Sequence, residues 1–175
     1  FYAGAKSPLY IVKNNKISKS QERFANAVIR NYLENYRSSF KNYNPNNPFV
    51  LVATPKGQKA ELGCLVNACL AVSTGWNPVY LGTDLSSRDI CEAAKNSSCS
   101  AVIMSILFPL NDPTVPLELE RIRNGLGGEF EIIINGKRSS IYSKICSKIG
   151  SHQIYDLFSL PNALEDIRTD VLRKI

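Results

Sequence analysis

The sequence predicts an α/β domain built on a doubly wound, five-stranded parallel sheet of flavodoxin-like order. Short runs that are apolar throughout suit strands buried on both faces, and segments with helical spacing alternate with them. Right-handed crossovers then place helices on both faces of the sheet. The five expected strands are residues 49–53, 78–82, 101–106, 130–134 and 153–156.

The segment before the first strand has a different character. Residues 18–40 carry apolar side chains at three- and four-residue spacing, and Ser18 with Gln21 forms a capping box, so we expect a helix there. The Asn- and Pro-rich segment 42–48 is typical of a linker and ends this helix. We therefore expect a domain boundary at the linker.

Each remaining helix is expected where a periodic segment follows a strand. The helix after the first strand ends at Gly75, Asp84 or Ser86 caps the next one, and Gly127 closes the third. The expected helices are residues 60–74, 88–95, 116–126, 139–149 and 162–173.

Composition and charge restrict the class of protein. A hydrophobic fraction of 44% is ordinary for a soluble domain, and no apolar run approaches the roughly 20 residues of a membrane-spanning helix. The net charge of +6 belongs to residues 1–47, which carry eight basic and two acidic side chains. We interpret this excess as a solvated helix face, with an anionic partner as the alternative. A cytoplasmic protein without membrane contact is expected.

Motifs for metal binding and catalysis are missing from the sequence. The five cysteines show no C-x-x-C spacing, and His152 is the only histidine. His152 opens the last expected strand, which puts it at the amino end of the sheet. There is no P-loop, no G-x-G-x-x-G, no nucleophile elbow and no H-E-x-x-H. We therefore expect neither enzymatic activity nor a metal held by the protein.

A ligand of a doubly wound sheet lies outside the carboxyl ends of the strands. The loops that reach this edge are residues 54–60, 82–85, 107–114, 135–138 and 157–161.

Three short motifs fall on these loops. The segments Gln58–Gly63, Ser105–Leu107 and Asn135–Gly136 are separated by 41 and 27 residues. This pattern resembles the cobalamin-binding domain family, which carries D-x-H-x-x-G, S-x-L and G-G at about these spacings. The strings ATPKGQKAELG and GWNPVYLGTDLS resemble the version in MerR-type light-responsive transcription regulators.

In that family a helical bundle precedes the domain and caps the ligand. The resemblance implies a DNA-binding domain before Phe1, outside this chain. It also implies two parts: residues 1–45 as the C-terminal part of a helical-bundle cap, and residues 46–175 as a cobalamin-binding-like domain.

The chain departs from the family where the ligand is held. The histidine that ligates cobalt in the family corresponds to Ala60, which has no donor atom. Its acidic partner corresponds to Gln58, and the first glycine of G-G corresponds to Asn135. The light-sensing subgroup also carries W-x9-E-H in its bundle, for which this chain has Val12, Glu22 and Arg23.

These departures remove both imidazoles that would face the cobalt. The resemblance then implies a tetrapyrrole-binding sensory domain that holds a bilin such as biliverdin, or a cobalamin, without a bond from protein to metal. Arg23 suits a propionate of such a ligand. The expected binding residues are Val12, Glu22, Arg23, Gln58, Ala60, Gly63, Ser105, Leu107, Asn135 and Gly136.

Other interpretations stay open. A degenerate domain would bind no ligand and act as a protein–protein interaction or oligomerisation module. A corrinoid carrier of a mutase or methyltransferase would keep a histidine where this chain has Ala60, and haem would need Cys or Met ligation. For a regulator, the resemblance implies a homo-oligomer that contacts DNA through the domain outside this chain.

Overall fold

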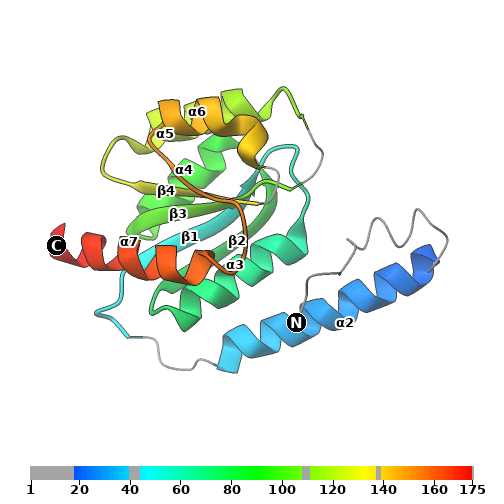
Figure 1. The fold of residues 1–175 in the computed structure, drawn as a ribbon. Helices are drawn as coiled ribbons and strands as arrows, with labels where there is room; N and C mark the ends of the chain where they lie inside the picture. Colours follow the sequence, from blue (N-terminus) through cyan, green and yellow to red (C-terminus); the bar gives the residue numbers. More distant parts are fainter. Residues whose placement is uncertain (1–17, 40–43, 108–110, 137–138, 175) are drawn as a thin grey trace.

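The computed structural model describes residues 18–39, 44–107, 111–136 and 139–174. Its centre is a parallel sheet of five strands in the order β2-β1-β3-β4-β5 (Figure 1). The strand order changes direction between β1 and β3, so the predicted doubly wound, flavodoxin-like fold is confirmed. The strands are β1 (Phe49–Pro55), β2 (Asn77–Leu85), β3 (Cys99–Ser105), β4 (Glu131–Asn135) and β5 (His152–Ile154).

Helices cover both faces of the sheet. The helices α3 and α7 pack on one face, and α4, α5 and α6 pack on the other (Figure 1). Within the described ranges, no helix combines the length and the apolarity needed to cross a membrane. The bounds are α2 (Lys19–Ser39), α3 (Glu61–Ser73), α4 (Ser87–Asn96), α5 (Val115–Leu126), the 3-10 turn η1 (Ser139–Tyr142), α6 (Ser143–Lys148) and α7 (Leu160–Lys174).

Two elements differ from the expected ranges. Strand β2 is longer than 78–82 because it pairs with β1 as far as Leu85, opposite Pro55. The expected helix 139–149 is divided into η1 and α6. Tyr142, at the junction, is buried with a backbone φ of −102°, outside the α-helical range. Its hydroxyl accepts a hydrogen bond from the Asp112 N–H at 2.8 Å, which anchors the junction to the loop before α5.

Strand β1 lies at the centre of the core, as its apolar sequence predicts. Leu51 and Ala53 belong to the cluster on the α4 and α5 face, while Val50 and Val52 belong to the cluster on the α3 and α7 face. On the second face, the Trp76 indole N–H donates to a carbonyl oxygen of α7 at 3.0 Å. The sheet, packed on both faces, thus positions the loops at its ends.

Helix α2 lies outside this core and has no buried residue. Its predicted capping box is confirmed, because the Gln21 N–H donates to Ser18 Oγ at 3.1 Å and the Ser18 N–H donates to Gln21 Oε1 at 2.7 Å. The helix packs along α3, and its N-terminal half extends past the sheet on the side to which the strands point (Figure 1). The assignment of residues 1–45 to a helical bundle stays a prediction.

Candidate functional site

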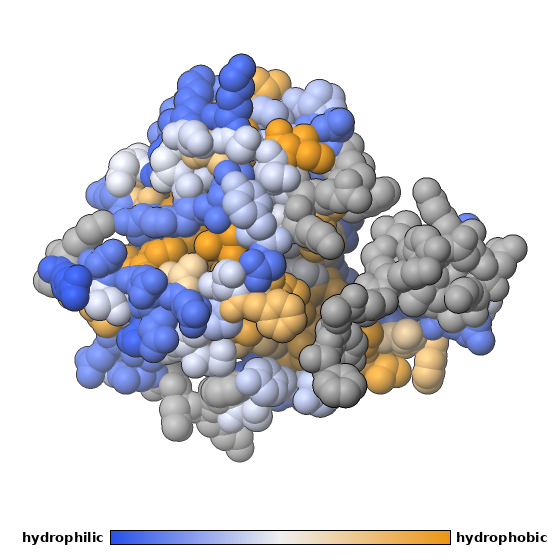
Figure 2. Space-filling model, viewed as in Figure 1, coloured by the Kyte–Doolittle hydropathy of each residue, from blue (hydrophilic) through white to orange (hydrophobic). Residues whose placement is uncertain are grey.

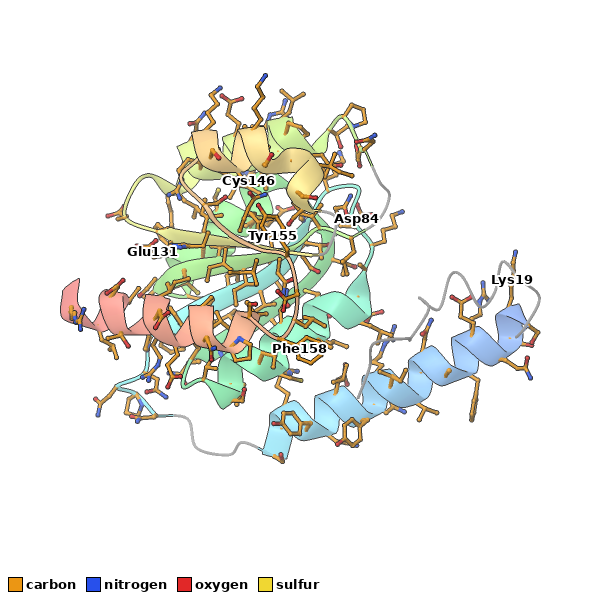
Figure 3. The ribbon with its side chains drawn as sticks, in the orientation of Figure 1. Lys19, Asp84, Glu131, Cys146, Tyr155 and Phe158 are labelled. Carbon is orange, nitrogen blue, oxygen red and sulfur yellow. The ribbon has the colours of Figure 1, made fainter. Side chains whose placement is uncertain are left out.

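Seven of the ten expected binding residues gather at the carboxyl ends of the strands. They come from three separate parts of the chain, and side chains between α3 and β3 bring these parts into contact. In Figure 3 the label of Asp84 marks this edge of the sheet, and that of Glu131 lies toward the opposite edge. The seven are Gln58, Ala60 and Gly63 around the start of α3, Ser105 and Leu107 at the end of β3, and Asn135 and Gly136 at the end of β4.

Gln58 connects the loops after β1 and β3 with the end of β2. Its side chain is fully buried, and its Oε1 accepts a hydrogen bond from the Leu107 N–H at 3.1 Å. Its own carbonyl oxygen accepts from the Thr54 hydroxyl and from the Asp84 N–H. The loops after β1 and β3 and the end of β2 therefore meet at one residue, and its neutral side-chain amide accepts from Leu107 without burying a charge.

Two glycines allow the elements of this edge to approach each other closely. A Cβ on Gly63 would lie 2.6 Å from Leu107 Cδ1 and 2.9 Å from Ser105 Oγ. Gly136 has a φ of +143°, and a Cβ there would lie 2.3 Å from the carbonyl oxygen of Ile106. Only glycine fits such approaches without a shift of its neighbours. The side chains of Ser105 and Leu107 thus fill the space beside Gly63.

A buried pair of amides lies one helical turn beyond Gly63. The Asn135 Nδ2 donates to Asn67 Oδ1 at 2.8 Å, and the two residues are only 3% and 1% exposed. The Asn67 Nδ2 has no hydrogen-bond partner among the described residues. A buried donor left unpaired costs about 1–3 kcal/mol. Sequence reasoning missed Asn67, although its i+4 spacing from Gly63 puts both on one face of α3.

Ala60 is the N-cap residue of α3, and its side chain makes no capping hydrogen bond. In the part of the chain that the structure describes, no group of three or more His, Cys, Asp or Glu side chains could hold a metal ion. The N-cap position of α3 thus carries a methyl group, which offers no donor atom to a ligand. The expectation that the protein ligates no metal stays a prediction.

Arginines at seven-residue spacing define the face of α2 that meets the domain. Arg30 forms an ion pair with Glu61, the first residue of α3. The Arg37 guanidinium carbon lies 5.5 Å from the centre of the Tyr80 ring. Because seven residues are nearly two full turns, Arg23 lies on this same face. Sequence reasoning missed Arg30 because its partner belongs to another element.

The other candidates on the N-terminal side lie farther from the sheet. Glu22 belongs to the first turn of α2, and Arg23 follows it. Lys19, labelled in Figure 3, marks this end of the helix beyond the α/β domain. Val12 lies outside the described residues. The structure therefore does not bring Glu22 and Arg23 into the cluster around Gly63.

Asp84 fixes the end of β2 against the loop after β1. Its Oδ1 accepts a hydrogen bond from the Gly57 N–H at 2.8 Å, and its carboxylate lies 3.5 Å from the Lys59 ammonium. The hydrogen bond from Gly57, aided by Lys59, lowers the pKa of Asp84. Asp84 has a φ of +62°, a conformation that aspartate adopts more readily than most residues.

The thiols of the described residues are protonated at neutral pH. Burial raises the pKa of Cys64, the residue after Gly63, to about 12, and Glu61 adds to the effect. Burial also raises the pKa of Cys99 to about 12. A bilin attaches through a thiolate, so these pKa values disfavour covalent attachment. The remaining thiols whose pKa burial raises are Cys69, Cys91 and Cys146.

The opposite edge of the sheet is hollowed. Two adjacent cavities of about 440 and 250 Å³ lie at the amino ends of the strands and share Glu131 in their walls. His152 opens β5 there, as predicted, with Nε2 3.0 Å from Glu131 Oε2. The remaining charged side chains of the walls are Lys95, Glu129, Asp170 and Arg173. Between α6 and α7, Figure 2 shows a band of apolar surface bordered by hydrophilic side chains.

No protein-family model matches the chain, and no curated protein matches it. Several solved structures share its fold. A cobalamin-binding protein from Desulfitobacterium hafniense DCB-2 is 16% identical, with a TM-score of 0.57 over 78% of this chain and 66% of that chain. The monomethylamine corrinoid protein of Methanosarcina barkeri is 14% identical, with a TM-score of 0.66 over 89% of this chain and 74% of that chain.

A third similar structure is the methanol:cobalamin methyltransferase complex MtaBC of Methanosarcina barkeri, 14% identical with a TM-score of 0.56. It is matched over 95% of this chain and 66% of that chain. This chain thus spans about two thirds of the length of two of these proteins. At these identities the likeness shows the fold: an α/β domain of the architecture found in corrinoid proteins.

Proposed function

We propose that this chain is a tetrapyrrole-binding sensory domain of a transcription regulator, not an enzyme. The ligand lies between α2 and the carboxyl ends of the strands and is either a corrinoid or a bilin such as biliverdin. Light or ligand state changes the packing of α2 on the domain, and through it the oligomeric state and DNA binding. The DNA contact belongs to a domain outside this chain.

One observation carries the proposal: residues from three distant parts of the chain converge on the sheet edge where doubly wound folds bind ligands. The fold likeness supports it further. The match to the monomethylamine corrinoid protein covers 89% of this chain, more than the α/β domain alone provides. The likeness therefore extends into the segment that holds α2.

The residues present fit a tetrapyrrole held without a bond to its metal. Ala60 would offer no donor atom to the metal of such a ring, and Arg23 lies on the domain-facing side of α2 with a guanidinium suited to a carboxylate. The bound group would supply light absorption. The residues of this chain would hold the ring against the segments that Gln58 connects and would form ion pairs with the carboxylates of the ring.

A second candidate function has its own supporting observations. The space beside Gly63 is filled by Ser105 and Leu107, as in a domain that takes no ligand. The face of α2 that points away from the domain exposes Phe24, Val28 and Tyr32 at four-residue spacing, with exposures of 73%, 51% and 69%. These features favour a protein–protein interaction module.

Absorption spectroscopy tests the proposal. The purified chain is incubated separately with cobalamins, biliverdin and haemin, desalted, and its spectrum is recorded in the dark and after illumination. Retained red absorbance that shifts on illumination supports a bilin photoreceptor, and a retained corrin spectrum supports a cobalamin site. A protein that stays colourless in every case overturns the proposal in favour of the interaction module.

Matched variants locate the site. Gly63→Ala adds a methyl group against Leu107 and Ser105, whose side-chain ends can shift, so the fold survives while uptake falls about tenfold. Gly128→Ala is the control at the opposite edge, where a Cβ meets nothing within 4 Å. Equal uptake by both variants would place the ligand elsewhere.

A further inference from the structure

We propose that the two cavities at the amino edge of the sheet bind a free amino acid with an apolar side chain. The cavities lie at the opposite end of the strands from the proposed tetrapyrrole site, and the inference does not depend on that function. Their walls come from the end of α4, the starts of β3, β4 and β5, and the C-terminal half of α7.

The cavities have the size of a small-molecule site. The larger, of about 440 Å³, falls within the range of roughly 300–1,000 Å³ in which proteins bind small molecules. The smaller, of about 250 Å³, adjoins it at Glu131, which Figure 3 labels beside the C-terminal half of α7. The segments before β4 and β5 are held together by Arg123, whose guanidinium donates to the carbonyl oxygens of Gly127, Phe130, Ile149 and Gly150.

Two side chains of opposite charge line the larger cavity without meeting each other. They are Lys95, in the last turn of α4, and Glu129, two residues before β4. Both are exposed, and neither forms an ion pair with any residue that the structure describes. A carboxylate fits beside Lys95 and an ammonium group beside Glu129, with charge-assisted hydrogen bonds to each. A free amino acid carries these two groups on one carbon.

Glu131 supports the ammonium end but is already engaged. The His152 Nε2 lies 3.0 Å from Glu131 Oε2, and because a carboxylate only accepts hydrogen bonds, the imidazole is the donor. Burial lowers the pKa of Arg123 and the charge of Glu131 partly offsets this, so these two side chains also interact. Glu129 is therefore the direct partner of the ammonium group, and Glu131 adds negative potential to the same end.

The side chain of the ligand is assigned from the apolar residues of α7. Val171 lines the larger cavity and Ile167 the smaller. Because they are four residues apart, they lie on one face of the helix, where they are 5% and 6% exposed. Phe130 contributes apolar surface from the segment before β4. An aliphatic side chain such as that of leucine would leave water along this strip, next to the two charges.

Four probes of matched shape test the inference on the full chain. They are L-leucine, L-leucinamide, which lacks the carboxylate, 4-methylpentanoate, which lacks the ammonium group, and glycine, which lacks the side chain. Binding is followed through the amide NMR signals of the amino edge. Leucine is expected to bind saturably, leucinamide and 4-methylpentanoate about fivefold more weakly, and glycine at least tenfold more weakly.

Two variants assign each charge to its partner. Lys95→Gln is expected to weaken leucine binding about fivefold and to leave leucinamide binding unchanged, because leucinamide has no carboxylate to lose a partner. Glu129→Gln should weaken leucine binding to a similar extent and leave 4-methylpentanoate binding unchanged. Both side chains are exposed, so the fold is retained. Glu92→Gln is the control, since Glu92 is an exposed carboxylate of α4 outside the cavity walls.

The remaining outcomes count against the site. Leucine that does not bind saturably at about 10 mM, or that shifts signals of the carboxyl edge instead, overturns the inference. Equal binding of leucine and 4-methylpentanoate, or a Glu129 variant that behaves like the Glu92 control, overturns it as well. Each of these results leaves the tetrapyrrole proposal untouched, and a chain that retains no tetrapyrrole leaves the amino acid site untouched.

Discussion

The two edges of the sheet are built from different kinds of residue. At the amino edge, long charged side chains such as Lys95 and Arg173 stand around open cavities. At the carboxyl edge, glycines and short polar side chains pack against each other, and Gln58, Ser105 and Asn135 are nearly fully buried. The two amino-edge cavities thus lie away from the close glycine contacts and buried polar side chains of the carboxyl edge. We therefore place the candidate site by its buried polar atoms and close approaches, and not by empty volume.

The largest expected effect comes from adding one methyl group at the carboxyl edge. Gly136→Ala would put a Cβ 2.3 Å from the Ile106 carbonyl oxygen at a φ of +143°, and backbone cannot give way as a side chain can. We expect a loss of about 3 kcal/mol or more in the free energy of unfolding, measured by urea denaturation. At the amino edge, Gly128→Ala should stay within about 0.5 kcal/mol. Similar losses of unfolding free energy in the two variants would contradict the difference in packing between the two edges.

A smaller effect is expected from removing one polar side chain at each edge. Gln58→Ala leaves the Leu107 N–H without its acceptor and opens a small cavity, so we expect a loss of about 2 kcal/mol. His152→Ala removes a half-exposed pair with Glu131 and should change stability by less than about 0.5 kcal/mol. Chemical denaturation of both variants measures the difference. A Gln58 variant as stable as the wild type would show that the contact between the loops after β1 and β3 does not depend on this side chain.

The smallest expected effect is the pH dependence that Asp84 gives to the stability of the fold. The folded pKa of Asp84 lies below its ordinary value of 3.8, chiefly because of the Gly57 N–H. The stabilising contribution is therefore complete above pH 3.8 and is lost as the pH falls through the folded pKa. An NMR titration should give the Asp84 carboxyl carbon and the Gly57 amide proton one shared midpoint below 3.8. A midpoint at 3.8 or above would contradict the hydrogen bond.

The local sequence predicts those parts of the fold that local physics determines. The apolar run of β1 and the capping box of Ser18 and Gln21 each act within a few residues, and both are as expected. The division of the helix after β4 was not predictable, because Tyr142 is anchored by Asp112, 30 residues away. Predictions fail here where a distant partner sets the backbone.

The same reason limits prediction of the site. Motif spacing put Gln58, Gly63 and Gly136 at one edge, since the ends of parallel strands meet there. Sequence reasoning missed Asn67 because its partner Asn135 lies 68 residues away. Nothing in the sequence of α3 alone indicates that this asparagine is buried. Arg30 was missed for the same reason, because its ion pair with Glu61 depends on the packing of α2 on α3.

The burial of the thiols has a consequence for their reactivity toward oxidants. Raising the pKa from 9.0 to about 12, as burial does at Cys64 and Cys99, lowers the thiolate fraction about a thousandfold. Peroxides and other electrophiles react with the thiolate, so these side chains are slow to oxidise. Brief changes in oxidant concentration therefore leave these two thiols largely unmodified. Under the proposed function, a change in the state of the domain reports its ligand, and not the oxidant concentration of its surroundings.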